Sequence, residues 1–137
     1  MAHCLAMQAA PGSSVTELPL LSVVDDDQSV RESLPDLLAE FGFATRAFSS
    51  AEEFLSSDCI AKTKCLILDV VMPKMSGLEL YQELKRRGLN LPVVFITAQR
   101  DEAVRVRMLA QGAAGFLLKP FSETDLLAAV RVGLRRD

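Results

Sequence analysis

The chain has 137 residues, of which 50% are hydrophobic and 24% are charged, and its formal net charge is −3. This length and composition suit one globular domain. The mild charge excludes a broad basic footprint for nucleic acid and a polybasic membrane patch. No apolar run approaches the roughly 18 residues that a membrane-spanning helix needs. The three cysteines have no metal-type spacing.

Residues 1–19 are low in charge and have no clear hydrophobic period. They contain the turn-forming run Pro11-Gly12-Ser13-Ser14. We therefore predict a flexible N-terminal lead-in over residues 1–19, followed by a single domain over residues 20–137.

The first half of the domain begins with a short apolar strand, Leu20–Val24. A helix is predicted over Ser29–Phe41, ended by Gly42. Pro35 lies inside this helix and predicts a bend, with a break in the helix as the alternative. The apolar positions at helical spacing are Val30, Leu34, Leu37, Leu38 and Phe41.

A second strand is predicted at Ala44–Phe48. Ser50-Ala51-Glu52-Glu53 has the pattern of a capping box and opens a short helix to about Ser56. Cys65–Leu68 is continuously apolar, which is typical of a strand covered on both faces.

The second half repeats the alternation of strand and helix. The predicted elements are a helix at Leu78–Arg87, a strand at Val93–Thr97, a helix at Asp101–Gln111, a strand at Gly115–Leu118, and a last helix capped by Ser122-Glu123-Thr124-Asp125. Five strands alternating with five helices indicate an α/β fold, a doubly wound five-stranded parallel sheet. Right-handed crossovers with one reversal of winding favour the strand order 2-1-3-4-5 in a three-layer sandwich.

Charged residues follow three of the predicted strands at the point where each strand ends. Asp25-Asp26-Asp27 follows the first strand, Asp69 the third, and Lys119-Pro120 the fifth. Strand carboxyl ends gather on one edge of a parallel sheet, so these groups should share one pocket. At an effective dielectric near 20, two like charges about 4 Å apart repel by roughly 4 kcal/mol. A cation bound by this oxygen-only set, Mg²⁺ or Mn²⁺, would relieve the repulsion.

These groups fit phosphoryl transfer to a carboxylate. Asp69 could act as the nucleophile, Lys119 supplies a point charge for an anion, and Thr97 at the end of the fourth strand supplies a hydroxyl donor. Each signal taken alone has a plainer interpretation, since an acidic triplet after a strand is most often a solvated loop or a helix cap. The joint occurrence at separate strand ends favours the functional interpretation.

Four stretches of the chain resemble the receiver domain of bacterial two-component response regulators. They are Val23–Asp27, Leu68–Leu78, Phe95–Ala98 and Leu118–Phe121, and the resemblance runs from about Leu20 to Leu134. It implies a flavodoxin-like fold in which Asp69 is the phosphoacceptor. It also implies that Asp26 and Asp69 are metal ligands for Mg²⁺ and that Asp25 binds the ion through water.

The resemblance also assigns expected roles around the phosphoryl group. The backbone carbonyl of Val71 would be a further metal ligand, and the Lys119–Pro120 bond would be cis. Val71 and Gln99 occupy the positions that tune dephosphorylation in the family. The expected phosphoryl-binding and switch residues are Thr97, Ala98, Lys119 and Phe116.

The implied function is a phosphorylation-dependent signalling switch in the cytoplasm, with no enzymatic activity beyond its own phosphorylation and dephosphorylation. Its partners would be a sensor histidine kinase or a histidine phosphotransfer protein, and a downstream protein that docks on the face formed by the fourth helix, fifth strand and fifth helix. Direct contact with nucleic acid or membrane is not expected, and dimerisation is left open.

We favour a stand-alone receiver, with a fragment of a longer DNA-binding transcriptional regulator as the alternative. A phosphatase is disfavoured because Val71 stands where such enzymes place a general acid. A partner-binding module that takes no phosphate is disfavoured because all the site residues are in place.

Overall fold

A computed structural model of the chain describes residues 18–135, and the structural statements below concern those residues. The predicted lead-in falls outside them except for residues 18 and 19. The elements in chain order are β1 (Leu20–Val24), α1 (Gln28–Ala39), β2 (Ala44–Phe48), α2 (Ala51–Leu55), β3 (Cys65–Asp69), α3 (Gly77–Arg86), β4 (Val93–Thr97), α4 (Glu102–Ala110), β5 (Gly115–Leu118) and α5 (Glu123–Arg135).

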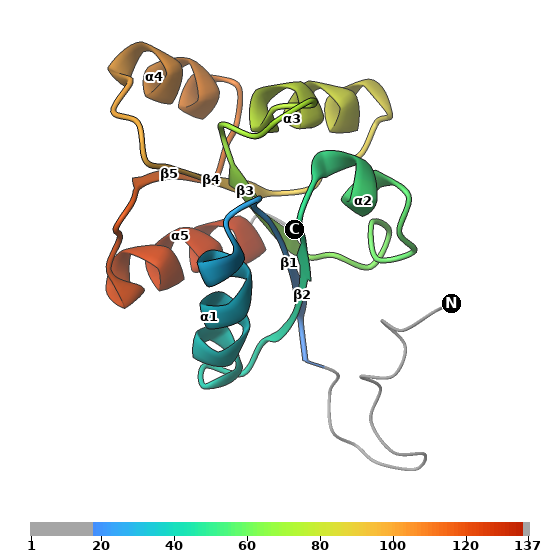
Figure 1. Cartoon of the computed structure of the whole chain (residues 1–137), viewed down its shortest axis with the longest axis vertical. Coiled ribbons are helices and arrows are strands. Elements are labelled where there is room, and N and C mark those ends of the chain that lie inside the picture. Colours follow the sequence, from blue (N-terminus) through green and yellow to red (C-terminus); the bar gives the residue numbers. More distant parts are fainter. Residues whose placement is uncertain (1–17, 136–137) are drawn as a thin grey trace.

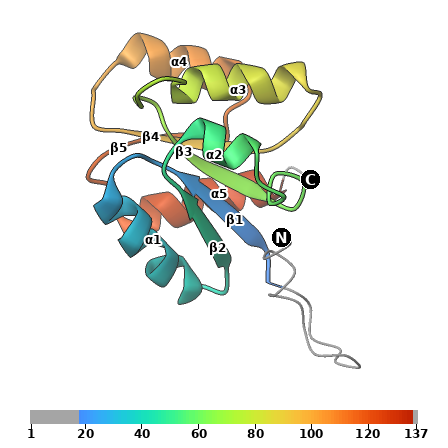
Figure 2. The same ribbon diagram turned by 45° about the vertical axis from the view of Figure 1, so that its right-hand side comes forward.

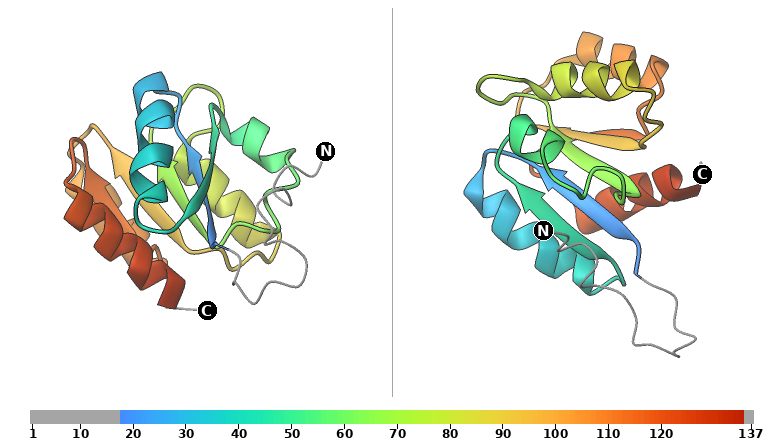
Figure 3. Two further views of the ribbon diagram at one scale, coloured as in Figure 1. Left: turned by 90° about the horizontal axis from the view of Figure 1, so that it is seen from below. Right: turned by 90° about the vertical axis from the view of Figure 1, so that its right-hand side faces the viewer.

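The five strands form one parallel sheet in the order β2-β1-β3-β4-β5, which confirms the predicted order. Helices α1 and α5 cover one face of the sheet, and α2, α3 and α4 cover the other (Figures 1 and 2). The views of Figure 3 show the same three layers. The winding reverses between β1 and β3, so the crevice of the fold opens where these two strands end.

Each central strand contributes to two hydrophobic cores because successive side chains point to opposite faces of a sheet. In β3, Leu66 and Leu68 pack beneath α2, α3 and α4, whereas Cys65 and Ile67 pack against α1 and α5. All five residues of β3 are buried. The continuously apolar strand predicted at this position is therefore confirmed.

Helix α1 begins and ends slightly earlier than predicted. Asp27 caps it, with its side chain accepting a hydrogen bond from the backbone N–H of Ser29. The helix runs unbroken through Pro35, so the alternative of a break is wrong, while the bend stays a prediction. The helix ends before Phe41 because Gly42, at φ +89°, closes it with a short turn. Phe41 is consequently exposed rather than part of the apolar face.

The start of α2 departs from a full capping box. The Ser50 hydroxyl accepts from the backbone N–H of Glu53, as predicted. The Glu53 carboxylate, however, reaches one residue further back and accepts from both the backbone N–H and the hydroxyl of Ser49. Ser49 offers two donors in place of one, which accounts for the shift.

Helix α3 has the complete capping box that the sequence analysis did not assign. The Ser76 hydroxyl accepts from the Glu79 backbone N–H at 3.1 Å, and the Glu79 carboxylate accepts from the Ser76 backbone N–H at 2.9 Å. The pattern Ser-x-x-Glu at 76–79 was the available signal.

Replacing this cap residue, Ser76→Ala, should lower the free energy of unfolding by about 1 kcal/mol, because the Glu79 backbone N–H loses the hydroxyl that accepts its hydrogen bond. Urea unfolding followed by circular dichroism measures the effect. The matched control is Ser33→Ala, which changes an exposed serine inside α1 and should be neutral or slightly stabilising. Equal effects of the two substitutions would contradict the capping role.

None of the helices within residues 18–135 combines the length and the apolar character needed to cross a bilayer.

Candidate functional site

The predicted site residues meet at the carboxyl edge of the sheet. Asp25 follows β1, Asp69 ends β3, and Lys119 follows β5. The Lys119 ammonium donates a hydrogen bond to Asp25 Oδ2 at 2.8 Å and lies 3.9 Å from Asp69 Oδ1. Three chain segments that are far apart in sequence thus form one charged cluster.

Asp25, Asp26 and Asp69 each place a carboxylate oxygen within 4.8 Å of the others. Asp25 and Asp69 are buried, whereas Asp26 is exposed to solvent. The donor set contains only carboxylate oxygens, which suits a hard divalent cation such as Mg²⁺. The open side at Asp26 leaves room for the water ligands that Mg²⁺ retains. The residues therefore fit the ion.

Both carboxylate oxygens of Asp25 accept a hydrogen bond. Oδ2 accepts from Lys119, and Oδ1 accepts from the backbone N–H of Asp27 at 2.9 Å. Asp27 itself caps α1 through both the backbone N–H and the hydroxyl of Ser29, and the hydroxyl bond is the main cause of its lowered pKa. The third acid of the triplet is therefore a helix cap, the plainer interpretation that the sequence also allowed.

Burial raises the pKa of the Asp69 carboxyl to about 7, and the neighbouring charge of Asp25 adds to the rise. The ammonium of Lys119 and the backbone N–H of Val71 act in the opposite direction without cancelling it. For Lys119, burial alone would lower the pKa, but Asp25 and Asp69 outweigh burial and raise it. The ammonium therefore stays charged, and the cluster has an excess of negative charge that a divalent cation would neutralise.

Gly77, the first residue of α3, approaches the end of β3 very closely. A methyl group at its Cα would lie 2.1 Å from the backbone oxygen of Asp69. Its N–H donates to the Val70 carbonyl at 2.9 Å. The helix start is thus packed directly onto the backbone of the residue that carries the central carboxylate.

The family sequence profile described as "Response regulator receiver domain" matches residues 21–131. The chain belongs to this response regulator receiver family. It is 40% identical over 116 residues to the response regulator protein TodT of Pseudomonas putida, covering 85% of this chain and 51% of TodT. It is 43% identical over 114 residues to the transcriptional regulatory protein FixJ of Azorhizobium caulinodans, covering 83% of this chain and 54% of FixJ.

Solved structures agree with this assignment. The structure of the response regulator StyR matches with a TM-score of 0.80 and 44% identity, over 87% of this chain and 60% of StyR. The FixJ-N structure matches with a TM-score of 0.78 and 32% identity, over 89% of this chain and 98% of that one. The receiver spans about half the length of the curated relatives it matches.

The expected switch residues of this receiver lie beside the acidic cluster. Thr97 is buried at the end of β4, and its hydroxyl accepts from the Gln99 backbone N–H at 3.1 Å. A hydroxyl that accepts one bond can still donate its proton to a phosphoryl oxygen. Ala98, between them, is exposed. The Lys119–Pro120 peptide bond is cis.

Phe116 in β5 is half-buried, with its ring centroid 5.9 Å from that of Phe95. It lines a cavity of about 170 Å³ beneath the start of α4, together with Gln99, Arg100, Asp101, Glu102, Arg105 and Leu118. Val71, directly after the acidic cluster, is 49% exposed. Val71 and Gln99, the two residues expected to tune dephosphorylation, are therefore both exposed to solvent.

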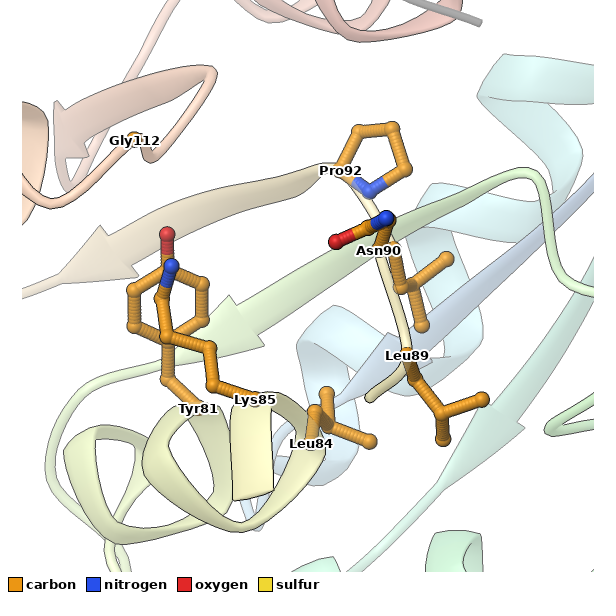
Figure 4. Close-up of a pocket in the computed structure, with 8 residues that line it drawn as sticks. Tyr81, Leu84, Lys85, Leu89, Asn90, Pro92 and Gly112 are labelled. Atoms are coloured by element: carbon orange, nitrogen blue, oxygen red, sulfur yellow. The ribbon is translucent and has the colours of Figure 1, made fainter. Parts of the chain in front are cut away.

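A larger cavity of about 450 Å³ lies at the other end of the strands and is shown in Figure 4. Tyr81 and Lys85 of α3 point there toward the turn at Gly112. Both donate to the backbone carbonyl of Gln111, which caps α4, at 3.2 and 2.9 Å. No carboxylate is among its lining residues. This cavity therefore lies between α3 and the end of α4 and does not extend the acidic site.

Proposed function

We propose that this receiver accepts a phosphoryl group on Asp69 from a sensor histidine kinase or a histidine phosphotransfer protein, and acts as a phosphorylation-dependent switch. The convergence of Asp25, Asp26 and Asp69 with Lys119 supports the proposal most directly. A carboxylate oxygen of Asp69 forms the new bond to phosphorus as the bond from phosphorus to the donor nitrogen breaks.

The residues of the site divide the remaining tasks. Lys119 and the Thr97 hydroxyl would contact the phosphoryl oxygens. Asp26, Asp69 and the Val71 carbonyl would hold the ion, and Asp25 would act through water. A bound Mg²⁺, for which Mn²⁺ could substitute, supplies charge neutralisation on the phosphoryl oxygens. It also favours ionised Asp69, whose raised pKa otherwise leaves part of the carboxyl protonated and unreactive near neutral pH.

The change on phosphorylation would pass from Thr97 and Ala98 to Phe116, and from there to the face formed by α4, β5 and α5. Exposed apolar side chains on α4, Val106 and Leu109, support this face as the docking surface for a downstream protein or a second copy. The same proposal places the receiver in the cytoplasm, where ATP-dependent kinases act. It includes no catalytic activity beyond the gain and loss of its own phosphoryl group.

A second candidate is the receiver part of a longer transcriptional regulator. The observation in its favour is that matched relatives, including FixJ, are about twice as long as the matched region. Reading the gene beyond codon 137 distinguishes this candidate from a stand-alone receiver.

A small phosphodonor tests the phosphoacceptor. With acetyl phosphate and Mg²⁺, intact-mass spectrometry should show one added phosphoryl group, and Asp69→Asn should show none, because the amide cannot attack phosphorus. Asp58→Asn is the control, since Asp58 is exposed in the loop after α2. Undiminished labelling of Asp69→Asn would overturn the assignment.

A further inference from the structure

Arg31, on the second turn of α1, reaches back to the acidic loop. Its Nη1 atom donates a hydrogen bond to the backbone carbonyl of Asp25 at 3.0 Å, and the residue is half-buried. Side chains of an α-helix lean toward its N-terminus, so a residue on the second turn covers the first. The contact closes the loop between β1 and α1 with a side chain from the helix.

The Asp25 carbonyl lies where the sheet no longer supplies a donor. The Asp25 N–H still bonds to the Phe48 carbonyl at 3.1 Å, but the register of β1 with both of its neighbours ends at Val24. Asp25 is fully buried, and a buried acceptor that lacks a donor costs free energy. Arg31 supplies this bond, so the guanidinium fixes the main chain of the residue whose carboxylate holds Lys119.

Ion pairing with a carboxylate does not explain why an arginine occupies position 31. Within residues 18–135, no carboxylate lies within salt-bridge distance of Arg31. A cation over the first turn also opposes the helix dipole, which favours negative charge there. The favourable contact that the structure shows for Arg31 is the hydrogen bond to the Asp25 carbonyl.

We propose that Arg31 is a positioning residue for the divalent-cation site: it anchors the loop through the Asp25 carbonyl and so fixes the directions of the Asp25 and Asp26 carboxylates before the ion arrives. This inference rests on the proposed function, in that it takes Mg²⁺ as the ligand of the acidic cluster. It adds a residue of α1 to the groups that set the affinity for the ion.

The loss of Arg31 has two effects, one on charge and one on positioning, and they would change the affinity for the cation in opposite directions. Removing a positive charge near three carboxylates would by itself tighten cation binding. Losing the anchor of the loop weakens binding, because ligands that are no longer held in place must be ordered by the ion. The proposal commits to weaker binding.

Isothermal titration calorimetry of the whole chain with MgCl₂ measures whether Mg²⁺ binds more weakly or more tightly. Arg31→Met, which keeps the apolar stem and removes every donor, should weaken binding by about tenfold. Arg31→Lys keeps a cationic donor and should stay within about threefold of wild type. Arg131→Met removes the same charge from an exposed position more than two turns into α5, and it should change nothing.

A metal-free measurement tests the loop directly. The Asp27 amide, bonded to Asp25 Oδ1, should exchange its hydrogen at least about tenfold faster in Arg31→Met, measured in the presence of a chelator. Phosphorylation by acetyl phosphate should reach the wild-type rate when Mg²⁺ is saturating and fall behind only at low Mg²⁺. A general loss of structure would lower the phosphorylation rate at both Mg²⁺ concentrations.

The proposal is overturned if Arg31→Met binds Mg²⁺ as tightly as wild type or more tightly, or if Asp27 exchange is unchanged. Should Arg31→Met fail to fold, Arg31→Gln, whose amide is too short to reach the carbonyl, takes its place with the same expected results. Wild-type protein that binds Mg²⁺ but takes no phosphate on Asp69 would remove the proposed function and leave these binding comparisons valid.

Discussion

Replacing Gly77 with alanine should destabilise this receiver by about 2–3 kcal/mol and weaken its binding of Mg²⁺. The added Cβ would lie 2.1 Å from the Asp69 backbone oxygen and 2.9 Å from its carbonyl carbon. Both neighbours are main-chain atoms, so no side-chain rotation relieves the clash. Either α3 or the end of β3 must move, and the end of β3 carries the Asp69 carboxylate of the acidic cluster.

Urea unfolding and calorimetric Mg²⁺ titration measure the two effects of Gly77→Ala. Gly88→Ala is the control at the other end of α3, where a Cβ meets nothing within 4 Å but φ is +76°. It should cost about 1 kcal/mol through backbone strain alone and leave Mg²⁺ affinity unchanged. A Gly77→Ala protein with wild-type stability and affinity would contradict the close packing of α3 on β3.

Replacing Asp69 with asparagine should stabilise the metal-free protein above neutral pH by roughly 1–3 kcal/mol, after allowing for solvent screening. The pKa of Asp69 is raised in the folded state from 3.8 to about 7 because the carboxyl is buried and lies beside Asp25. The folded state therefore binds the proton more tightly than the unfolded chain, and the ionised carboxylate works against folding.

The pH dependence follows from that difference. Between about pH 4 and pH 7 the folded state carries the extra proton, so the contribution of Asp69 to stability is greatest at low pH and is lost as pH rises through 7. Asp69→Asn should remove this decline, and the two proteins should converge near pH 4. Thermal unfolding across this range measures it. Saturating Mg²⁺ should stabilise wild type more than the variant, and the reverse order would contradict a shared cation site.

The strand order was predictable because the apolar runs are short, regularly spaced and separated by helical patterns. The candidate site was predictable for a related reason: charged residues at the carboxyl ends of parallel strands must emerge at the same edge of the sheet. Asp25, Asp69 and Lys119 are each such a residue, and the structure brings all three together. Helix ends were less certain, as at Phe41, because local turn bonds and a nearby glycine decide where the last helical bond falls.

Other features depend on contacts that no spacing in the sequence encodes. Gly77 looks like an ordinary loop glycine until the Asp69 backbone is placed beside it. Arg31 looks like a solvated helix residue until the Asp25 carbonyl is seen to face it. Lys119 was expected to serve the phosphoryl group, but in this structure its shorter contact is with Asp25, at 2.8 Å against 3.9 Å for Asp69. That division depends on side-chain directions, which only the folded chain defines.

The bond between Lys119 and Asp25 joins positions 94 residues apart. A nascent chain still emerging from the ribosome has Asp25 and Asp69 long before it has the lysine that completes the charged cluster. On the proposed function, a product that ends before Lys119 lacks the ammonium of the site and should take up phosphate more slowly than the full chain.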